Sequence, residues 1–447
     1  MTSSARDDSL HVAIIGAGIT GINLALGLQA RNVRFTVYER APGIHEIGAG
    51  IGFSPNSERA MTLLSPDVQR TYKGVANPNG EDWFQWVNGF DSDELLFRMH
   101  VGKDGFQGCR RQDILEAWAK LVTTANPDCI QFNKELVSID SLSTQDTLTI
   151  HFKDGTTAPA DVVIGADGIR SRVRQLLLPP SSPAARPGYT RKFCFRSLAP
   201  MSSAISAIGA ARALTRFMYV GKGAHVVTYP VGNSTQLNIL LVVSDPNLEW
   251  PDDKRHTAPG TRQEAEEAFK DWHETVRKIV GLLPDKMEKW AIFDMGEHPA
   301  LLEEGGYAKG RVALAGDAAH ATGPHLGAGA GMGIEDALVL SELLRRVDER
   351  VKEYEGDSDE GGVKKKGLVK EALRVFTNVR YERTQHVVQS TRKACELFHW
   401  VDPEVGRDSE RFGQQITPRF LNIWEHDVEG MVREALDQLE KGHSEIV

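Results

Sequence analysis

The segment at residues 11–21 restricts the possible folds of this chain more than any other stretch of its sequence. It places the apolar run at 12–15 directly before the pattern Gly-Ala-Gly-Ile-Thr-Gly. Apolar residues at helical spacing follow, and a second apolar run at 35–38 ends in Glu39. This order of strand, glycine turn, helix, strand and acid predicts a dinucleotide-binding βαβ unit.

Each glycine of the pattern has a separate role in such a unit. Gly16 permits the tight turn, Gly18 lets the backbone approach a pyrophosphate, and Gly21 lets the helix pack closely on the strand. The helix N-terminus favours the pyrophosphate, and Glu39 accepts hydrogen bonds from the ribose. The alternative is a glycine turn without a ligand, which leaves the matching strand, helix and acid unexplained.

Length, charge and cysteine content restrict the class of protein. A chain of 447 residues is long enough for two or three domains. Its 52 basic and 61 acidic side chains give a net charge of −9, which argues against nucleic acid as a partner. The polar first ten residues and the lack of a long apolar run predict no signal peptide and no membrane span. The four scattered cysteines match no zinc or disulfide pattern, so we expect no metal and a cytoplasmic protein.

Two further clusters of glycine lie outside the first motif. One occupies residues 46–52, directly after the ribose-binding strand, and we expect its backbone N–H groups, including that of Gly52, to face a ligand. The other is the run at 327–331, which contains Gly327 and Ala330. Plain turns are the alternative for both clusters.

Two aspartates follow expected buried strands. Asp167 comes after the strand at 161–164, and Asp317 comes after the strand at 311–315. Each aspartate alone is explained equally well as a helix N-cap. The order and spacing of the three motifs together favour one shared, nucleotide-containing ligand.

On these residues the chain resembles the FAD-dependent aromatic hydroxylases, the single-component (group A) flavoprotein monooxygenases. The resemblance implies that the first motif binds the ADP half of FAD, that the Gly-Asp motif binds the ribityl chain, and that residues 327–331 present N–H groups to the flavin ring. It implies a role of the Asp-Gly motif in both FAD contact and NAD(P)H use. The family's arginine at a helix start matches Arg111, with Arg110 as the neighbouring alternative. The expected cofactor-binding residues are Gly16, Gly18, Gly21, Glu39, Gly52, Arg111, Asp167, Asp317, Gly327 and Ala330.

The predicted fold class is α/β, with a Rossmann-like FAD-binding domain, an inserted, mainly antiparallel β domain for the substrate, and a C-terminal helical region. The expected boundaries are 1–78, 106–182 and 285–350 for the FAD-binding domain, 79–105 and 183–284 for the substrate domain, 351–366 for a charged mobile loop, and 367–447 for the C-terminal helices.

Within the substrate domain the chain is similar to fungal salicylate-hydroxylase-like enzymes and hydroxylases of polyketide-derived rings. The matching segments are residues 192–196 and 225–230, and they imply that Arg196 and Tyr229 are catalytic residues that hold the substrate phenolate. The chemistry agrees, because a cation fixes the ring and stabilises the electron-rich phenolate. The alternative is a paired or surface arginine and a half-buried tyrosine.

Other polar and aromatic side chains have two interpretations. His320 and His325 are either acid–base groups near the flavin or structural hydrogen-bonding residues. Aromatic residues early in the expected substrate domain are assigned to the core and not to a substrate cage. These are Trp83, Phe84, Trp86 and Phe106.

The expected function is hydroxylation of a salicylate-like, resorcylate-like or polyketide-derived phenol, with or without dearomatisation or loss of CO2. The family implies NAD(P)H as transient reductant and O2 transfer through a C4a-hydroperoxyflavin. We expect a small aromatic substrate, no nucleic acid, no membrane, and a monomer or homodimer. Three alternatives stay open: a flavin epoxidase or spirocyclase acting on an alkene or indole, a flavin oxidase without NAD(P)H, and a non-enzymatic escort protein for prenylated GTPases.

Overall fold

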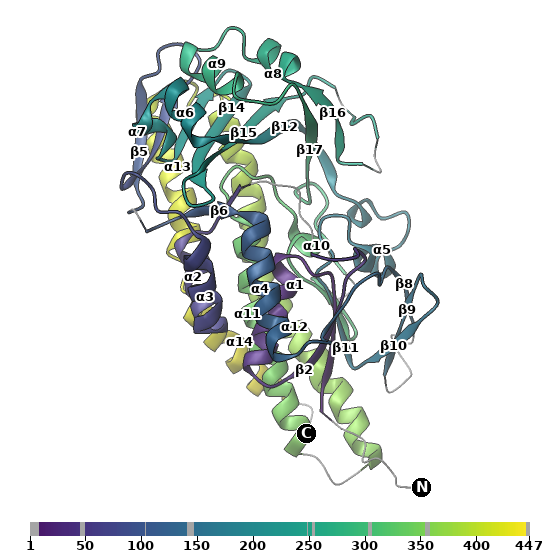
Figure 1. The fold of residues 1–447 in the computed structure, drawn as a ribbon. Coiled ribbons are helices and arrows are strands. Elements are labelled where there is room, and N and C mark those ends of the chain that lie inside the picture. The colour runs from purple at the N-terminus through teal and green to yellow at the C-terminus, as the bar shows by residue number, and fades with distance from the viewer. Residues whose placement is uncertain are drawn as a thin grey trace.

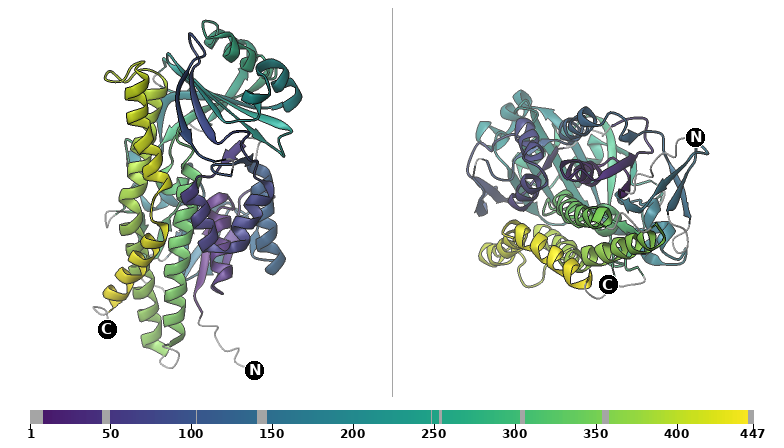
Figure 2. Two further views of the ribbon diagram at one scale, coloured as in Figure 1. Left: turned by 90° about the vertical axis from the view of Figure 1, so that its left-hand side faces the viewer. Right: turned by 90° about the horizontal axis from the view of Figure 1, so that it is seen from below.

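The computed structural model describes residues 9–44, 50–102, 104–140, 147–247, 249–252, 255–302, 306–353 and 358–443. Parts of the expected glycine cluster at 46–52 and of the expected loop at 351–366 lie outside these residues. Two large sheets stand one above the other, and long helices run along one side of both (Figures 1 and 2).

The lower sheet is six-stranded and mostly parallel, as the βαβ pattern predicts. Its central strand β1 is buried on both faces from Val12 to Ile15, which explains its unbroken apolar sequence. The order of its strands is β18 (Ala308–Lys309), β19 (Val312–Leu314), β11 (Val162–Gly165), β1 (His11–Ile15), β2 (Arg34–Tyr38) and β7 (Ile130–Gln131).

Helices enclose this lower sheet, and helix α1 is the most central of them. Its residues from 21 to 28 are all buried, since it packs against β2, α4 and α11. The other helices of this part are α2 (Pro55–Leu64), α3 (Pro66–Val75), α4 (Arg111–Ala125), α5 (Arg172–Leu177), α10 (Asp317–His320) and α11 (Gly329–Glu353), with α1 itself at Ile19–Ala30 and a 3₁₀ turn at Pro183–Ala185.

Two small sheets complete the lower part. A short antiparallel pair links the second glycine cluster to the strand before α4, with Gly50 opposite Arg110. The other small sheet has three antiparallel strands beside the cleft described below. The strands are β3 (Gly50–Gly52), β6 (Gly108–Arg110), β8 (Leu136–Asp140), β9 (Leu148–Phe152) and β10 (Thr157–Ala160).

The upper sheet has eight strands, and only the β13–β4 pair is parallel. This confirms the inserted, mainly antiparallel β domain. The order of its strands is β16 (Thr257–Thr261), β17 (Lys286–Asp294), β12 (Gly188–Pro200), β15 (Gln236–Ser244), β14 (Ala224–Val231), β13 (Phe217–Gly221), β4 (Trp83–Asn88) and β5 (Leu95–His100).

Both faces of the upper sheet are covered. Short helices pack on the face that carries Phe195, Tyr219 and Leu241. The opposite face, which carries Phe84 and Trp86, faces the lower part of the molecule and the C-terminal helices. The short helices are α6 (Met201–Ile208), α7 (Ala210–Ala213), α8 (Arg262–Ala268) and α9 (Glu274–Val280).

The C-terminal region is helical, as expected, and it spans both parts of the molecule. Its helices α12 (Ser358–Phe398), α13 (Ser409–Trp424) and α14 (Val428–His443) run along one side in Figure 2. Helix α12 packs on α11, and α13 packs on β5 and α2. None of the described helices combines the length and apolarity needed to cross a bilayer.

Two boundaries differ from the sequence-based expectation. Strand β17 pairs with β12 in the upper sheet, so residues 286–294 belong to the β domain and not to the FAD-binding domain. Residues 358–366 form the start of α12 and not a loop, and Lys365 there pairs with Asp161 at 2.8 Å.

Candidate functional site

The first glycine motif forms the turn between β1 and α1. Gly16 has a φ of +105°, which favours glycine. Gly18 is the N-cap residue of α1, and a Cβ added there meets nothing within 4 Å, so the space before the helix N-terminus is open. A Cβ on Gly21 would instead overlap the carbonyl oxygen of Gly16. Gly16 and Gly21 therefore shape the turn, while Gly18 faces open space.

The cleft in front of α1 has a volume of about 790 Å³. Arg40, Arg111 and Arg170 lie along it, together with Glu39 and Asp167. Cofactor sites of natural proteins have volumes of several hundred cubic ångströms. A cleft of this size, with an open helix N-terminus and basic walls, fits an anionic dinucleotide.

The carboxylate of Glu39 is held in place at the edge of this cleft. One oxygen accepts the N–H of Ala17 and the other accepts the N–H of Ala41, each at 2.8 Å. A carboxylate oxygen has more than one lone pair, so both oxygens keep acceptor capacity. This geometry suits the expected contact with ribose hydroxyls.

Asp167 caps a helix start with one oxygen and leaves its other oxygen without a partner among the described residues. Its Oδ2 accepts the N–H groups of Arg172 and Val173 at 2.6 and 3.1 Å, as a carboxylate at a helix start does. Its Oδ1 is buried and has no hydrogen-bond partner among the described residues. Burial raises the pKa of Asp167, although hydrogen bonds oppose that effect. The orphaned oxygen at the cleft fits a hydroxyl donor from a bound cofactor.

The Gly316-Asp317 motif is fixed by a buried carboxylate on helix α11. Asp336 Oδ2 accepts the N–H of Gly316 at 2.8 Å and lies 2.6 Å from Nε2 of His320. Gly316 has a φ of +61°, and a Cβ there would overlap Oγ1 of Thr20, so glycine is required. His320 is therefore held by a buried hydrogen bond to Asp336, which fits the second of the interpretations given above.

Helix α11 carries two adjacent buried acids that share one arginine. Arg380 of α12 donates to Asp336 at 2.7 Å and to Glu335 at 2.6 Å, and Arg383 adds a contact to Glu335 at 2.7 Å. Burial opposes ionisation of both acids, but Arg380 and the neighbouring cations lower the pKa of each. This network ties the C-terminal helices to the Gly-Asp motif.

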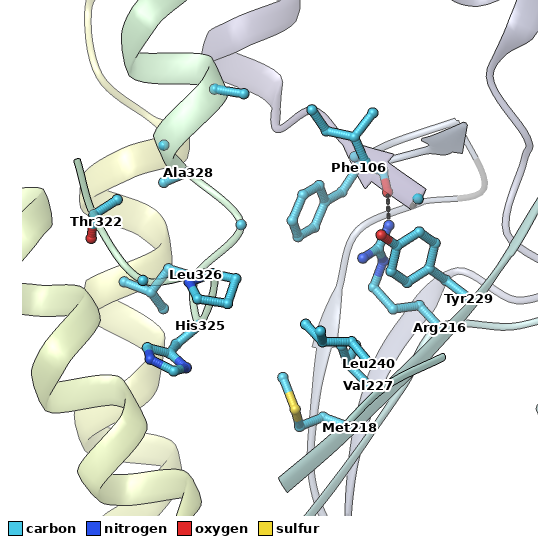
Figure 3. A pocket seen from close by; sticks show the side chains of 18 of the residues that line it. Phe106, Arg216, Met218, Val227, Tyr229, Leu240, Thr322, His325, Leu326 and Ala328 are labelled. Atoms are coloured by element: carbon cyan, nitrogen blue, oxygen red, sulfur yellow. Dashed lines mark hydrogen bonds between the residues drawn. The ribbon is translucent and has the colours of Figure 1, made fainter. Parts of the chain in front are cut away.

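A second cavity of about 260 Å³ lies between the two parts of the molecule. Figure 3 shows its two walls facing each other. One wall is the loop between α10 and α11, with Thr322, His325 and Leu326. The other wall is the lower face of the upper sheet, where Met218 and Val227 project into the cavity.

The expected flavin-binding residues meet at this second cavity. Gly52, Asp317, Gly327 and Ala330 line it, and Ala330 is the second residue of helix α11. Arg111 lines both cavities, so it lies where they adjoin. Arg110 instead pairs with Asp113 at 2.7 Å and lines neither cavity. A ligand that extends from the first cleft past Arg111 reaches the N-terminus of α11, where the helix dipole favours negative charge.

Arg216 is a second cation of this cavity besides Arg111, and the sequence analysis missed it. It is 4% exposed, and its guanidinium lies 4.2 Å from the ring centre of Tyr229 and 4.3 Å from that of Phe106. Its Nη2 donates to the carbonyl oxygen of Phe106 at 2.9 Å (Figure 3). Its Nε has no hydrogen-bond partner among the described residues.

Tyr229 lies in the cavity, as expected, whereas Arg196 does not line it. Tyr229 on β14 is buried, and burial raises its pKa to about 12, so its hydroxyl keeps its proton at neutral pH. Arg196 on β12 points to the same side of the sheet, but its guanidinium stacks on Trp290 at 3.4 Å. The structure thus brings Tyr229 together with Arg216, and it leaves Arg196 beside β17.

The apolar walls include two residues that the sequence analysis assigned to the core. Phe84 and Phe106 are buried core residues, as expected, and they also line the cavity, whereas Trp86 is fully buried in the aromatic core and does not line it. Phe420 of α13 also lines the cavity and contacts Phe84 edge to face, with ring centres 6.2 Å apart. Only the packing of distant segments reveals these contributions, because no local pattern marks them.

Comparisons with known proteins identify the family. The family model described as FAD binding domain matches residues 9–351. The chain is 44% identical over 443 residues to the FAD-dependent monooxygenase orf3 of Aspergillus niger, covering 97% of both chains. It is 37% identical to the salicylate hydroxylase asL1 of Sarocladium schorii, covering 98% of this chain and 93% of that one. The chain belongs to this family of FAD-dependent monooxygenases. The escort-protein alternative is thereby removed.

A solved structure gives the same result for the fold of this FAD-dependent monooxygenase. A salicylate hydroxylase in complex with its substrate superimposes with a TM-score of 0.79 at 30% identity, covering 96% of this chain and 98% of that one. The open N-terminus of α1, the free oxygen of Asp167 and the glycine-lined start of α11 fit FAD along the two cavities. NAD(P)H is the typical co-substrate of this family of monooxygenases.

Proposed function

We propose that this monooxygenase hydroxylates a phenolic ring that binds as its phenolate against Arg216 and Tyr229. The observation that carries the proposal is a buried guanidinium without a counter-ion. Burial lowers the pKa of Arg216, and the groups that oppose this effect are Tyr229 and Tyr72. Among the described residues no carboxylate pairs with this guanidinium. A buried charge is costly unless it is paired, so a cavity lined by such a cation favours an anionic ligand.

The chain's own residues then have distinct roles. Arg216 stabilises the phenolate oxygen, and the hydroxyl of Tyr229, which Figure 3 shows at the cavity, donates a hydrogen bond to it. The apolar walls at Phe84, Phe106 and Leu240 exclude water and hold the ring plane. The chemistry supplied by bound FAD is hydride uptake from NAD(P)H and activation of O2.

The N-terminus of α11 contributes electrostatics on the flavin side. Free N–H groups at residues 329–331 and the dipole of a 25-residue helix stabilise negative charge next to the loop. The bound phenolate is a stronger donor toward electrophilic oxygen than the neutral phenol. Holding it beside the flavin site therefore favours transfer of one oxygen atom next to, or at, the carbon that bears the hydroxyl or carboxyl group.

The test compares phenols with their O-methyl ethers. The holoenzyme, purified with FAD, is assayed for NAD(P)H consumption with salicylates, resorcylates and acylated resorcinols, and products are analysed by mass. We expect one phenol to stimulate NADH or NADPH oxidation and to gain one oxygen, with or without loss of CO2, while its methyl ether is inert.

Other outcomes favour the other enzymes of the same fold. Equal turnover of an ether, an alkene or an indole would support an epoxidase or spirocyclase, because such substrates carry no phenolate. Substrate oxidation that reduces the flavin without NAD(P)H, in the absence of O2, would support an oxidase.

A further inference from the structure

The second cavity is longer than one aromatic ring. Tyr229, at the end proposed for the phenolate, and His225 both line it, and they lie four residues apart on β14. Because a strand rises about 3.3 Å per residue, their Cα atoms are about 13 Å apart. One six-membered ring with its hydroxyl oxygen covers less than half of that distance. A phenol held at Arg216 and Tyr229 therefore leaves room for a ring substituent toward His225.

A third cavity, of about 160 Å³, adjoins this end of the second. Gly323 and His325 of the loop between α10 and α11 line both cavities, so they lie at the boundary between them. The ring of His325 lies 5.3 Å from that of His225, and Figure 3 shows it on the wall opposite Arg216. Gly323 adds no side chain to the boundary, where a Cβ would come within 2.7 Å of Nε2 of His325. The third cavity is thus the space next to the end of the second that a single ring does not fill.

The acidic side chains on the walls of the third cavity are already paired. Arg392 of α12 donates to both carboxylate oxygens of Asp294, at 2.8 and 2.6 Å, and lies 3.7 Å from Glu297. Glu396 pairs with Lys393 at 3.0 Å. A ligand in this cavity therefore meets acids whose charge is balanced by a neighbouring cation.

Two other groups on these walls have donor hydrogens to spare. Lys192 of β12 is half-buried, and in the described part of the chain its ammonium has one acceptor, the carbonyl oxygen of Thr190 at 3.3 Å, and no carboxylate partner. An ammonium has three donor hydrogens. Thr391 of α12 is 1% exposed, and its Oγ1 has no hydrogen-bond partner among the described residues. Burial, with smaller contributions from His225 and Lys192, lowers the pKa of His325 well below its ordinary value, so Lys192 is the cation at this boundary.

We propose that the third cavity is a subsite for a carboxylate at the end of a side chain on the substrate ring, held by Lys192 and Thr391. The inference rests on the proposed phenol substrate and adds a second anionic group to it. Arg216 and Tyr229 bind the phenolate at one end, and Lys192 and Thr391 bind the carboxylate at the other. Contacts at both ends restrict how the ring turns beside the flavin site, so the subsite selects among phenols by their side chain.

The test uses three phenols that share one ring. Orcinol carries a methyl group, olivetol carries a pentyl chain, and the third is an acid in which a carboxylate replaces the terminal methyl group of olivetol. The change in flavin absorbance on titration of the oxidised holoenzyme gives Kd for each phenol without turnover, and kcat/KM is measured in parallel. We expect the acid to bind about 10- to 100-fold more tightly than olivetol, the effect of a hydrogen bond to a charged group.

The variant that tests the subsite is Lys192→Met, which keeps an apolar stem and removes the ammonium. The acid should then bind no more tightly than olivetol, while Kd for orcinol and olivetol stays within threefold of the wild type. Lys222→Met is the control, because it removes the same charge from an exposed residue that does not line the cavity, and it should keep the preference for the acid. A preference that persists in Lys192→Met would overturn the proposal, and so would an equal loss with all three phenols, since that pattern indicates an entrance or a structural role.

A second variant, Thr391→Val, covers a Lys192→Met protein that does not fold. Valine has a similar shape and removes a buried hydroxyl without a partner, so the melting temperature should not fall. The affinity for the acid should decrease about two- to tenfold and that for olivetol should stay the same. An unchanged ratio of the two Kd values would overturn the subsite as proposed.

The wild type alone separates this inference from the proposed function. Turnover of phenols with equal affinity for the acid and olivetol would overturn only the subsite. If none of the three phenols is turned over, and no phenol among the salicylates, resorcylates and acylated resorcinols named above, the proposed function fails and the subsite fails with it.

Discussion

The guanidinium of Arg216 lies 4.2 Å from the ring centre of Tyr229, and both side chains line the cavity beside the flavin-binding loop. Arg216 directly precedes β13 and Tyr229 lies on the neighbouring strand β14, where Thr228 is opposite Phe217, so the two side chains lie on the same face of the sheet. Two residues 13 positions apart in sequence thereby lie side by side at the cavity. Arg196, the arginine that the sequence analysis favoured, stacks on Trp290 instead.

The first prediction separates the two arginines. Arg216→Gln should lower kcat/KM for the phenol about 10- to 100-fold, because a hydrogen bond to a charged group contributes about 1.5–3 kcal/mol. Glutamine can still donate to the carbonyl of Phe106, which limits damage to the fold. Arg196→Gln is the matched variant and should change kcat/KM by less than threefold. Steady-state kinetics with FAD content and melting temperature recorded for each variant provides the comparison.

A larger loss of kcat/KM in Arg196→Gln than in Arg216→Gln would instead indicate that Arg196 binds the anion. Such a result would mean that the Arg196 side chain leaves Trp290 when substrate binds. Equal and small effects of both substitutions would favour an uncharged substrate and hence the epoxidase or spirocyclase.

The second prediction uses two glycines of one motif. Gly18→Ala adds a methyl group in open space before α1, so the melting temperature of the apoprotein should stay the same while the Kd for FAD rises at least tenfold. Gly21→Ala adds a methyl group against the Gly16 carbonyl oxygen and should destabilise the apoprotein by about 1–3 kcal/mol. Urea unfolding and FAD titration of both variants measure the contrast. Unchanged FAD affinity in Gly18→Ala would argue against a pyrophosphate at this helix N-terminus.

Local sequence patterns were sufficient to predict much of the fold. The strand β1 and its glycine turn, the Asp167 and Asp317 motifs and most strands of the upper sheet follow from apolar runs with turn residues at their ends. The start of α12 could not be predicted in this way. The glycines and runs of like charge in this segment are typical of a loop. In the structure the segment is helical, and its Lys365 pairs with Asp161, which is distant in sequence.

The substrate side of the cavity was harder to predict for a related reason. Arg216, Phe106 and Phe420 lie in three segments without a shared motif, and only sheet register and the packing of α13 bring them together. The contact between Nδ1 of His225 and Nε2 of His399 could not be predicted either, since 174 positions separate the two residues. Residues that act through backbone turns leave a local signature, whereas side chains that converge from distant strands and helices do not.

The third prediction concerns the buried ion network behind the Gly-Asp motif. Arg380→Leu removes the cation shared by Glu335 and Asp336, all three fully buried, and should lower the free energy of unfolding by about 3–5 kcal/mol. FAD affinity should also fall, because Asp336 holds the N–H of Gly316. Lys278→Ala, which breaks the exposed pair with Glu274, is the control and should leave the urea midpoint unchanged. A stable Arg380→Leu protein with normal FAD affinity would contradict the role of the network.

The fourth prediction is a loss of stability on mild acidification. Burial lowers the pKa of His225 to about 3 and lowers the pKa values of His325 and His399 well below the ordinary value of 6.5. Below pH 6.5 the unfolded chain therefore binds protons that the folded protein excludes, and folding stability falls as pH decreases toward the folded-state pKa values. Each histidine that stays neutral contributes about 1.4 kcal/mol per pH unit in this window.

Urea unfolding of the apoprotein between pH 7.5 and 5 tests this prediction. This pH range lies above the ordinary pKa of the buried acids. The free energy of unfolding should be nearly constant above pH 7 and should fall steeply from pH 6.5 to 5. His399→Gln removes one of the titrating groups, so its slope should be smaller than that of the wild type by up to about 1.4 kcal/mol per pH unit. A wild-type slope near zero in this range would mean that the three histidines take up protons in the folded state, which would contradict the prediction.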